Sequence, residues 1–234
     1  MSDKHLSTQF DAELAKVSSK LLEMGGLVEA QVSHALAALI NRDIEQAELV
    51  ISTEPRINSK EVEIDADCAN IMARRQPTAR DLRLLLAITK TITNLERVGD
   101  EANRIAKMAK NTFEQNKPIS INFSELKIAG DLALQLLRRS LDAFARLDTV
   151  EAAAIVRDDD AIDDEFRSFV RKLITFLMED PRIISVGLDL LFVAKAIERI
   201  GDHAKNIAEF IIYIVKGTDV RHTPLAEMEK EALK

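Results

Sequence analysis

Apolar side chains recur along almost the whole chain at the spacing of an α-helix. Between residues 21 and 40 they fall largely on one stripe, formed by Leu21, Leu22, Val28, Val32, Leu36, Leu39 and Ile40. A repeat of three to four residues places such positions on one helix face, which is buried against neighbouring helices. Glycine and proline number only seven and five, so turns are rare and the elements long. The pattern therefore predicts an all-α fold.

Polar joints and proline-containing segments divide this pattern into two similar halves. In the first, Asp43 precedes a helix from about Ile44 to Arg75, bent at Pro55 because proline removes an interior hydrogen bond. Residues 76–78 are the clearest break, and a third helix should run over 79–112. In the second half, we expect a cap at Ser124, joints at Asp148 and Asp180-Pro181, and a last helix ending near Lys216. The expected units are a first three-helix repeat (1–115), a linker (116–123), a second three-helix repeat (124–216) and a tail with room for a short charged helix (217–234).

The division reflects an internal duplication. Leu95–Ala106 (LERVGDEANRIA) recurs as Ile197–Ala208 (IERIGDHAKNIA), with seven of twelve positions identical. The match extends upstream, where Asp43 corresponds to Asp148 and residues 50–51 to residues 155–156. A repeated supersecondary unit of this length predicts two tandem homologous three-helix bundles, separate or sharing a core.

The duplicated motif carries two carboxylates on one helix face. Glu96 and Asp100, and likewise Glu198 and Asp202, are four residues apart. Like charges at this spacing repel, so a basic side chain, a proton or a cation should neutralise them. The glycine inside each motif, Gly99 or Gly201, costs helix stability and suggests a closely packed neighbouring helix.

The helix before each motif can supply more polar oxygens. Counted from the break at Pro77, Glu54 lies as far before it as Asp100 lies after it, and the second half repeats the arrangement around Pro181. Equal distances from the apex place residues of an antiparallel pair at equal height. Two clusters are therefore expected, with Glu61 and Asp65 as a fallback pair in the first: Glu54, Asn58, Glu96 and Asp100, and then Asp159, Asp163, Glu198 and Asp202.

Oxygen ligands suit hard cations such as Mg²⁺, Ca²⁺, Mn²⁺ or ferric iron, and the sequence lacks the Cys/His set of a structural zinc site. We expect tighter binding in the second cluster, because Asn58 removes one charge from the first. The alternatives are a solvated acidic face, or pairing of these carboxylates with Arg97 and Arg199.

Composition and charge argue against several classes of protein. A net charge of −7 and a pI of about 5.3 argue against a nucleic-acid binder. The single cysteine, Cys68, forms no internal disulfide and is expected to be a buried thiol in a reducing compartment. The polar N-terminus and the shortness of apolar runs such as 210–215 predict a cytoplasmic protein without direct membrane insertion.

Several segments together resemble the PhoU family, the phosphate-specific transport system accessory proteins. They are Arg75–Arg83 (RQPTARDLR), both E-R-[VI]-G-D motifs, Phe192–Ala196 (FVAKA) and Tyr213–His222 (YIVKGTDVRH), the last being similar to the enterobacterial type. The resemblance implies two similar three-helix bundles, often in a homodimer. It also implies a negative regulator of the phosphate regulon, with the ATPase subunit of the phosphate ABC transporter and the phosphate sensor histidine kinase as partners.

In some members of the family, E/D-x-x-x-D motifs bind multinuclear metal clusters, which makes Mg, Mn, Fe or Zn the candidate cofactor. The resemblance places these motifs on Glu96/Asp100 and Glu198/Asp202, with Asp159/Asp163 upstream. Asn58, paired with Glu54, departs from the fully acidic pattern and puts metal occupancy of the first half in question.

Two other functions are open at this stage. One is a carboxylate-bridged metalloenzyme, although the chain lacks the Glu-x-x-His of ferritin-like sites, a Ser/His/Asp signature and a Gly-rich phosphate loop, so no catalytic residue is expected. The other is a purely structural helical scaffold. Arg80, Asp81 and Arg83, at the start of the third helix, are candidates either for capping and surface charge or for partner docking.

Overall fold

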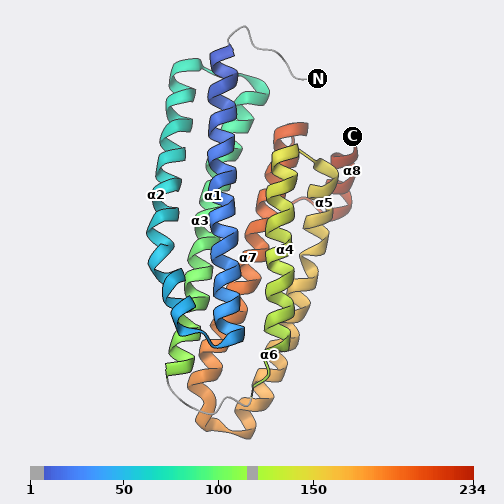
Figure 1. Cartoon of the computed structure of the whole chain (residues 1–234). Coiled ribbons are helices and arrows are strands. Elements are labelled where there is room, and N and C mark those ends of the chain that lie inside the picture. Colours follow the sequence, from blue (N-terminus) through green and yellow to red (C-terminus); the bar gives the residue numbers. More distant parts are fainter. Residues whose placement is uncertain (1–7, 115–120) are drawn as a thin grey trace.

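The computed structural model describes residues 8–114 and 121–234, and every regular element in these two ranges is helical (Figure 1). The first bundle consists of α1 (Thr8–Asn41), α2 (Ile44–Arg75) and α3 (Ala79–Glu114). The second consists of α4 (Ser124–Arg146), α5 (Thr149–Asp158), α6 (Asp160–Glu179), a 3-10 turn η1 (Pro181–Ile183) and α7 (Ile184–Lys216), followed by α8 (Leu225–Leu233). Most of the predicted linker 116–123 lies outside the described residues.

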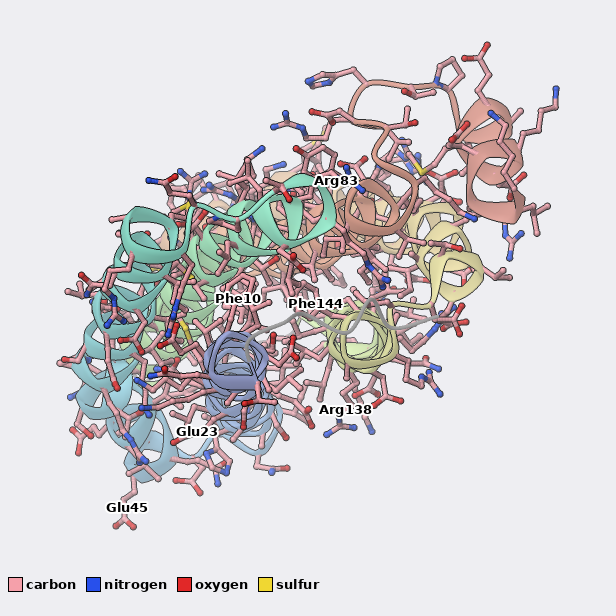
Figure 2. The ribbon with its side chains drawn as sticks, turned by 90° about the horizontal axis from the view of Figure 1, so that it is seen from above. Phe10, Glu23, Glu45, Arg83, Arg138 and Phe144 are labelled. Carbon is pink, nitrogen blue, oxygen red and sulfur yellow. The ribbon has the colours of Figure 1, made fainter. Side chains whose placement is uncertain are left out.

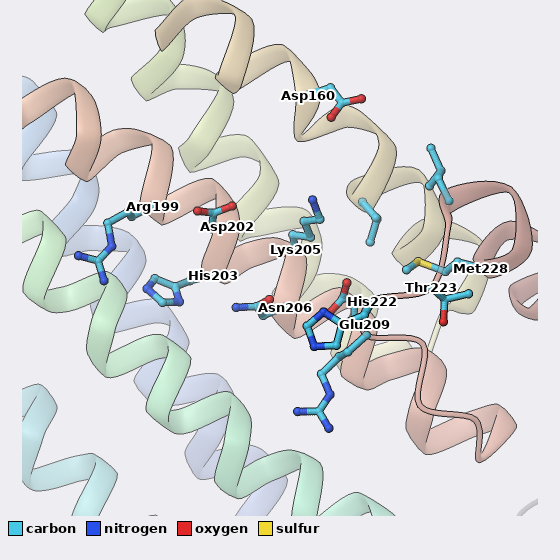
Figure 3. A pocket seen from close by; sticks show the side chains of 13 residues that line it. Asp160, Arg199, Asp202, His203, Lys205, Asn206, Glu209, His222, Thr223 and Met228 are labelled. Carbon is cyan, nitrogen blue, oxygen red and sulfur yellow. The ribbon is translucent and has the colours of Figure 1, made fainter. Parts of the chain in front are cut away.

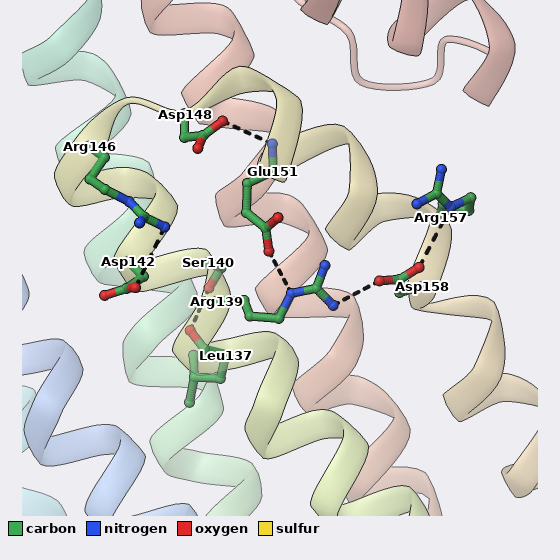
Figure 4. Close-up of polar contacts among 9 residues, drawn as sticks. All are labelled: Leu137, Arg139, Ser140, Asp142, Arg146, Asp148, Glu151, Arg157 and Asp158. Carbon is green, nitrogen blue, oxygen red and sulfur yellow. Dashed lines mark hydrogen bonds and ion pairs between the residues drawn. The ribbon is translucent and has the colours of Figure 1, made fainter.

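The predicted joints are confirmed by their capping contacts. Asp43 and Asp148 precede α2 and α5, and the side chain of each accepts a hydrogen bond from the backbone N–H three residues later. Figure 4 shows the contact of Asp148 with Glu151. Such contacts satisfy donors that a helix N-terminus leaves free. The expected cap at Ser124 is wrong, because Ser124 is the first residue of α4 and its N–H donates to the Asn122 side chain at 2.9 Å.

The middle helix differs between the halves. α2 passes through Pro55 as one helix, whereas its counterpart is interrupted at Asp159 and forms α5 and α6. Three consecutive aspartates lie at this interruption, where carboxylates oppose the negative C-terminal end of α5. Asp158 is paired with Arg139 of α4, which also binds Glu151 (Figure 4). The second repeat therefore has a divided middle helix that the sequence pattern did not predict.

The two bundles lie side by side, with α3 and α7 at the centre of the molecule (Figures 1 and 2). α1 also packs on α4, and buried side chains of both halves form one continuous core. The α2–α3 and α6–α7 hairpins point to opposite ends (Figure 1). α8 covers α5, where the Thr149 hydroxyl donates to the Ala232 carbonyl at 2.8 Å. In the described ranges no helix combines the length and the apolar character needed to cross a membrane.

The two motif glycines lie at close helix contacts, as the sequence predicted. A Cβ at Gly99 would come within 3.2 Å of Ile57, and one at Gly201 within 2.7 Å of Ile162. Ile57 and Ile162 are equivalent positions of the repeat, since each lies fourteen residues after its capping aspartate. In both halves the middle helix therefore lies close to the third helix at equivalent positions.

Candidate functional site

The second-half carboxylates lie together, as the hairpin argument predicted. Asp159 is only 5% exposed. Burial raises its pKa to about 6, with Asp202 and Asp163 adding to the rise and Lys205 opposing it. The pKa of Asp202 is also raised, first by desolvation and then by Glu198. Side chains from both sides of the α6–α7 hairpin thus act on one another.

Two lysines compensate this second-half cluster. Lys195 donates from Nζ to both carboxylate oxygens of Glu198, at 2.5 and 2.6 Å. Lys205 donates to Oδ2 of the buried Asp159 at 3.2 Å. Figure 3 shows Lys205 and Asp202 on the same helix, α7. Of the three neutralising agents that the sequence left open, basic side chains contact Glu198 and Asp159.

The first-half cluster is composed differently from the expectation. Glu96 on α3 has a raised pKa, because it is partly buried and because Asp100, Glu61 and Glu54 are close, while Arg97 opposes the rise. The fallback residue Glu61 thus joins the cluster, while the predicted Asn58 is exposed.

Neutral side chains bind the outer members of this cluster. The Asn103 amide donates to Glu54, and the Thr93 hydroxyl donates to Glu61 at 3.0 Å. In the part of the chain that the structure describes, no lysine or arginine forms an ion pair with any of the four carboxylates, Glu54, Glu61, Glu96 and Asp100. Their donor chemistry fits a hard cation.

Neither cluster is arranged as a finished coordination sphere. Across residues 8–114 and 121–234, no three His, Cys, Asp or Glu side chains converge closely enough to hold a metal ion. The first-half carboxylates would need to rotate toward a common point, and those of the second half would also have to release their lysines. By charge and donor type, only the first cluster fits a metal without displacing a cation.

The remaining motif residues join the two bundles. Glu101 of α3 is 3% exposed and forms ion pairs at 3.0 Å with Arg199 of α7 and with Arg104. At the position of α7 equivalent to Glu101 stands His203, whose Nδ1 contacts Oδ1 of Asn94 at 2.9 Å. Burial lowers the pKa of His203 to about 4. Arg199 thus serves the contact between bundles rather than the acidic cluster, a role that its position in a charged motif did not reveal.

A cavity of about 610 Å³ lies beside this contact, between α7 and the chain from Arg221 to Met228 (Figure 3). His203, Lys205 and Glu209 line it, and burial raises the pKa of Glu209 to about 7. Sequence reasoning missed this cavity, because it forms only when the tail folds back. The sequence pointed to this region only through the run Tyr213–His222, which is similar to the enterobacterial type.

The three candidate docking residues have different surroundings. Arg80 is exposed. Asp81 lies in the first turn of α3, and its backbone N–H donates to the Thr78 carbonyl. Arg83 reaches the C-terminal end of α7, donating to the Ile214 carbonyl at 3.4 Å and packing on Gly217. Arg83 therefore has a role within the fold, where a cation complements the helix end.

Two regions of the chain, residues 21–109 and 126–211, match the model of the PhoU domain. The chain belongs to the PhoU family. One copy of the domain in each half confirms the predicted duplication and the tandem helical architecture.

Curated relatives extend the match to the full length. A Burkholderia protein is 54% identical over 100% of both chains, and one from Escherichia coli K12 is 46% identical over 97% of this chain and 94% of its own. They are named phosphate-specific transport system accessory protein PhoU homolog and PhoU, respectively. The crystal structure of PhoU from Pseudomonas aeruginosa superposes with a TM-score of 0.86 at 44% identity, covering 89% of this chain and all of that one. A family of accessory proteins agrees with the prediction that the chain is not an enzyme.

Proposed function

We propose that this chain is a regulatory accessory protein of high-affinity phosphate transport and a negative regulator of the phosphate regulon. The observation that carries the proposal is 54% identity, over the full length of both chains, to a phosphate-specific transport accessory protein. The proposed partners are the ATPase subunit of the phosphate transporter and the phosphate sensor histidine kinase, which places the protein in the cytoplasm. A homodimer is part of the proposal and is measured directly by light scattering after gel filtration.

Deletion of the gene tests the regulatory role. We expect a phosphate-starvation reporter to stay on in rich phosphate and to be repressed again when the wild-type chain is supplied. A reporter that remains repressed without the protein would refute negative regulation.

A pull-down tests the partners. The full chain should capture the transporter ATPase and the sensor kinase from a lysate, in amounts that differ between high and low phosphate. Arg80→Ala probes docking at an exposed position. Arg83→Ala is compared with it, because a loss of partners in Arg83→Ala alone would also follow from weaker support of α7. If Arg80→Ala retains both partners at wild-type levels, docking does not depend on this part of the surface.

We further propose that the first-half cluster, formed by Glu54, Glu61, Glu96 and Asp100, binds a hard metal cation. The proposal is supported by four neighbouring carboxylates that form no ion pair with a lysine or arginine in residues 8–114 and 121–234, and by the raised pKa of Glu96. A bound Mg²⁺, Mn²⁺ or iron would neutralise the cluster and hold α2 against α3. Mn²⁺ binding by the full chain, followed by electron paramagnetic resonance, should be lost in Glu96→Gln/Asp100→Asn. An unchanged signal would exclude this cluster.

A further inference from the structure

The two acidic clusters differ at two positions that the duplication makes equivalent. Alignment of Leu95–Ala106 with Ile197–Ala208 pairs Asn103 with Lys205. Two residues before the aligned segments, it pairs Thr93 with Lys195. The first half thus has a hydroxyl and an amide where the second half has two ammonium groups.

The amide and one of the ammonium groups make the same contact. Glu54 and Asp159 are equivalent, since each lies eleven residues after the capping aspartate of its helix. Asn103 donates to Glu54, and Lys205 donates to Asp159 at 3.2 Å. Position for position, a neutral donor in the first half is replaced by a charged donor in the second.

The hydroxyl and the other ammonium group also bind cluster members. Thr93 donates to Glu61 at 3.0 Å, whereas Lys195 takes both oxygens of Glu198, at 2.5 and 2.6 Å. A carboxylate whose two oxygens both accept from an ammonium offers a metal only its remaining lone pairs, beside a positive charge. Phe166 lies 5.6 Å from the Lys195 ammonium, a distance at which the ring face adds to the stability of the cation.

These contacts determine the net charge that a metal ion would meet in the second cluster. The second cluster holds four carboxylates and two lysines, so a dication there would meet a net charge of about −2 rather than −4, and would meet repulsion from each ammonium. Removal of Lys205 would also leave Asp159 buried with its main counter-charge gone. The lysines therefore both satisfy the second cluster and compete with a metal for it.

We propose that Lys195 and Lys205 are built-in counter-ions that replace a metal ion in the second half of this chain. The second E-R-I-G-D motif is then a metal-independent cluster held by ion pairs, and these two positions decide whether the second half binds metal. This reverses the order of affinity expected from counting carboxylates alone. The inference concerns the second half and does not depend on the metal site proposed for the first.

An exchange of residues between the halves tests it. The full chain, freed of metal by chelation, is titrated with Mn²⁺ alone, and bound Mn²⁺ is measured by electron paramagnetic resonance. In Lys195→Thr/Lys205→Asn, which installs the first-half residues, we expect one more bound Mn²⁺ per chain than in the wild type, whose second half should bind none. Adding Glu198→Gln/Asp202→Asn to this variant should remove the gain, which assigns it to the second cluster. The reciprocal Thr93→Lys/Asn103→Lys should reduce first-half binding.

Circular dichroism establishes that each variant is folded, and Lys195→Thr alone serves if the double variant is not, because Lys195 is exposed. Wild-type protein that binds Mn²⁺ at Glu198 and Asp202 would overturn the inference, as would a folded exchange variant that gains no Mn²⁺. If the wild type binds no Mn²⁺ and the exchange variant does, the proposed first-half site fails while the inference about the lysines stands.

Discussion

At Gly201 the molecule has almost no room for a side chain. A Cβ there would lie 2.7 Å from Ile162 and 2.8 Å from the carboxylate of Asp159, a side chain fixed by its pair with Lys205. We expect Gly201→Ala to lower the free energy of unfolding by about 1–3 kcal/mol, despite the better helix propensity of alanine. Guanidinium denaturation measures the change.

Two other helical glycines provide the controls. Gly99→Ala meets its neighbours at 3.2 Å and should cost less, while Gly26→Ala enters open space and should stabilise the protein by up to about 1 kcal/mol. Equal effects at Gly201 and Gly26 would show that the close helix contact does not limit side-chain size.

Glu209 makes stability depend on pH. Its folded-state pKa of about 7 lies above its ordinary value of 4.5, so the folded state binds more protons than the unfolded state between these values. This contribution to stability is full below pH 4.5 and is lost as the pH rises to about 7 and beyond. Glu209→Gln removes the titrating group, so its stability relative to wild type should increase by about 1–3 kcal/mol from pH 5 to pH 8.

Comparing Glu209→Gln with the wild type measures the pH dependence of stability that comes from Glu209, although other groups also titrate in this range. Asp159, with its pKa of about 6, also loses stabilising protonation as the pH rises, whereas His203, with its pKa of about 4, contributes stability that is lost on acidification below about pH 6.5. Both are present in wild type and variant, so most of their contribution cancels in the difference, and what does not cancel is the coupling between Asp159 and Glu209. A difference that stays constant across this range would contradict the raised pKa of Glu209.

The sequence largely predicted which carboxylates form the acidic clusters, but not which lysines pair with them. Spacing within a helix and distance from a turn gave the heights of Glu96, Asp100 and Asp159. Height does not fix the direction in which a side chain points, so spacing gave Glu61 only as a fallback, although its charge acts on Glu96. Lysine side chains are long and flexible, so spacing does not show which carboxylate they bind. The repeat alignment nevertheless contained a usable signal, the replacement of Asn103 by Lys205.

Among the helices, α3 and α7 join the halves through an ion pair whose carboxylate is buried. Glu101 is 3% exposed and contacts Arg199 across this contact at 3.0 Å. Its raised pKa, caused by burial and only partly offset by the two arginines, shows that its charge is costly to desolvate. Glu101→Ala leaves Arg199 without this partner, but the Arg199 side chain is 40% exposed and can be hydrated, so we expect a loss of about 1–3 kcal/mol in the free energy of unfolding, measured by chemical denaturation.

Glu29→Ala is the matched control, since Glu29 also bridges the halves, from α1 to Arg138 of α4 at 2.6 Å. That pair faces solvent, as the peripheral place of Arg138 in Figure 2 shows, and should contribute less than about 1 kcal/mol. Equal losses in the two variants would mean that burial of the α3–α7 pair adds nothing.

Helix positions were more predictable than helix continuity. α2 begins and ends where the sequence placed it, because Asp43 caps one end and Pro77 follows the other. The interruption at Asp159 was missed, because it arises from contacts with other elements. Arg139 of α4 binds Asp158 and Lys205 of α7 binds Asp159, and neither partner is close in sequence.

At the scale of the whole molecule, the duplication produces one shared core rather than two separate ones. α3 and α7 pack more extensively on each other than either does on any helix of its own bundle, and buried side chains of both halves form a single cluster. A chain of 234 residues is long enough to unfold in two steps. The shared core opposes this, because unfolding one half would expose the apolar central face of the other.

We therefore expect the two halves to unfold in one transition. Far-UV circular dichroism reports on all helices, and the fluorescence of Tyr213, the only tyrosine in a chain without tryptophan, reports on the end of α7. The two signals should give coincident denaturation curves. Glu101→Ala should shift both to lower denaturant by the same amount, because it weakens the contact on which both bundles depend. Curves that separate in the wild type would show that each bundle is stable by itself, and that the α3–α7 contact joins domains rather than completing a core.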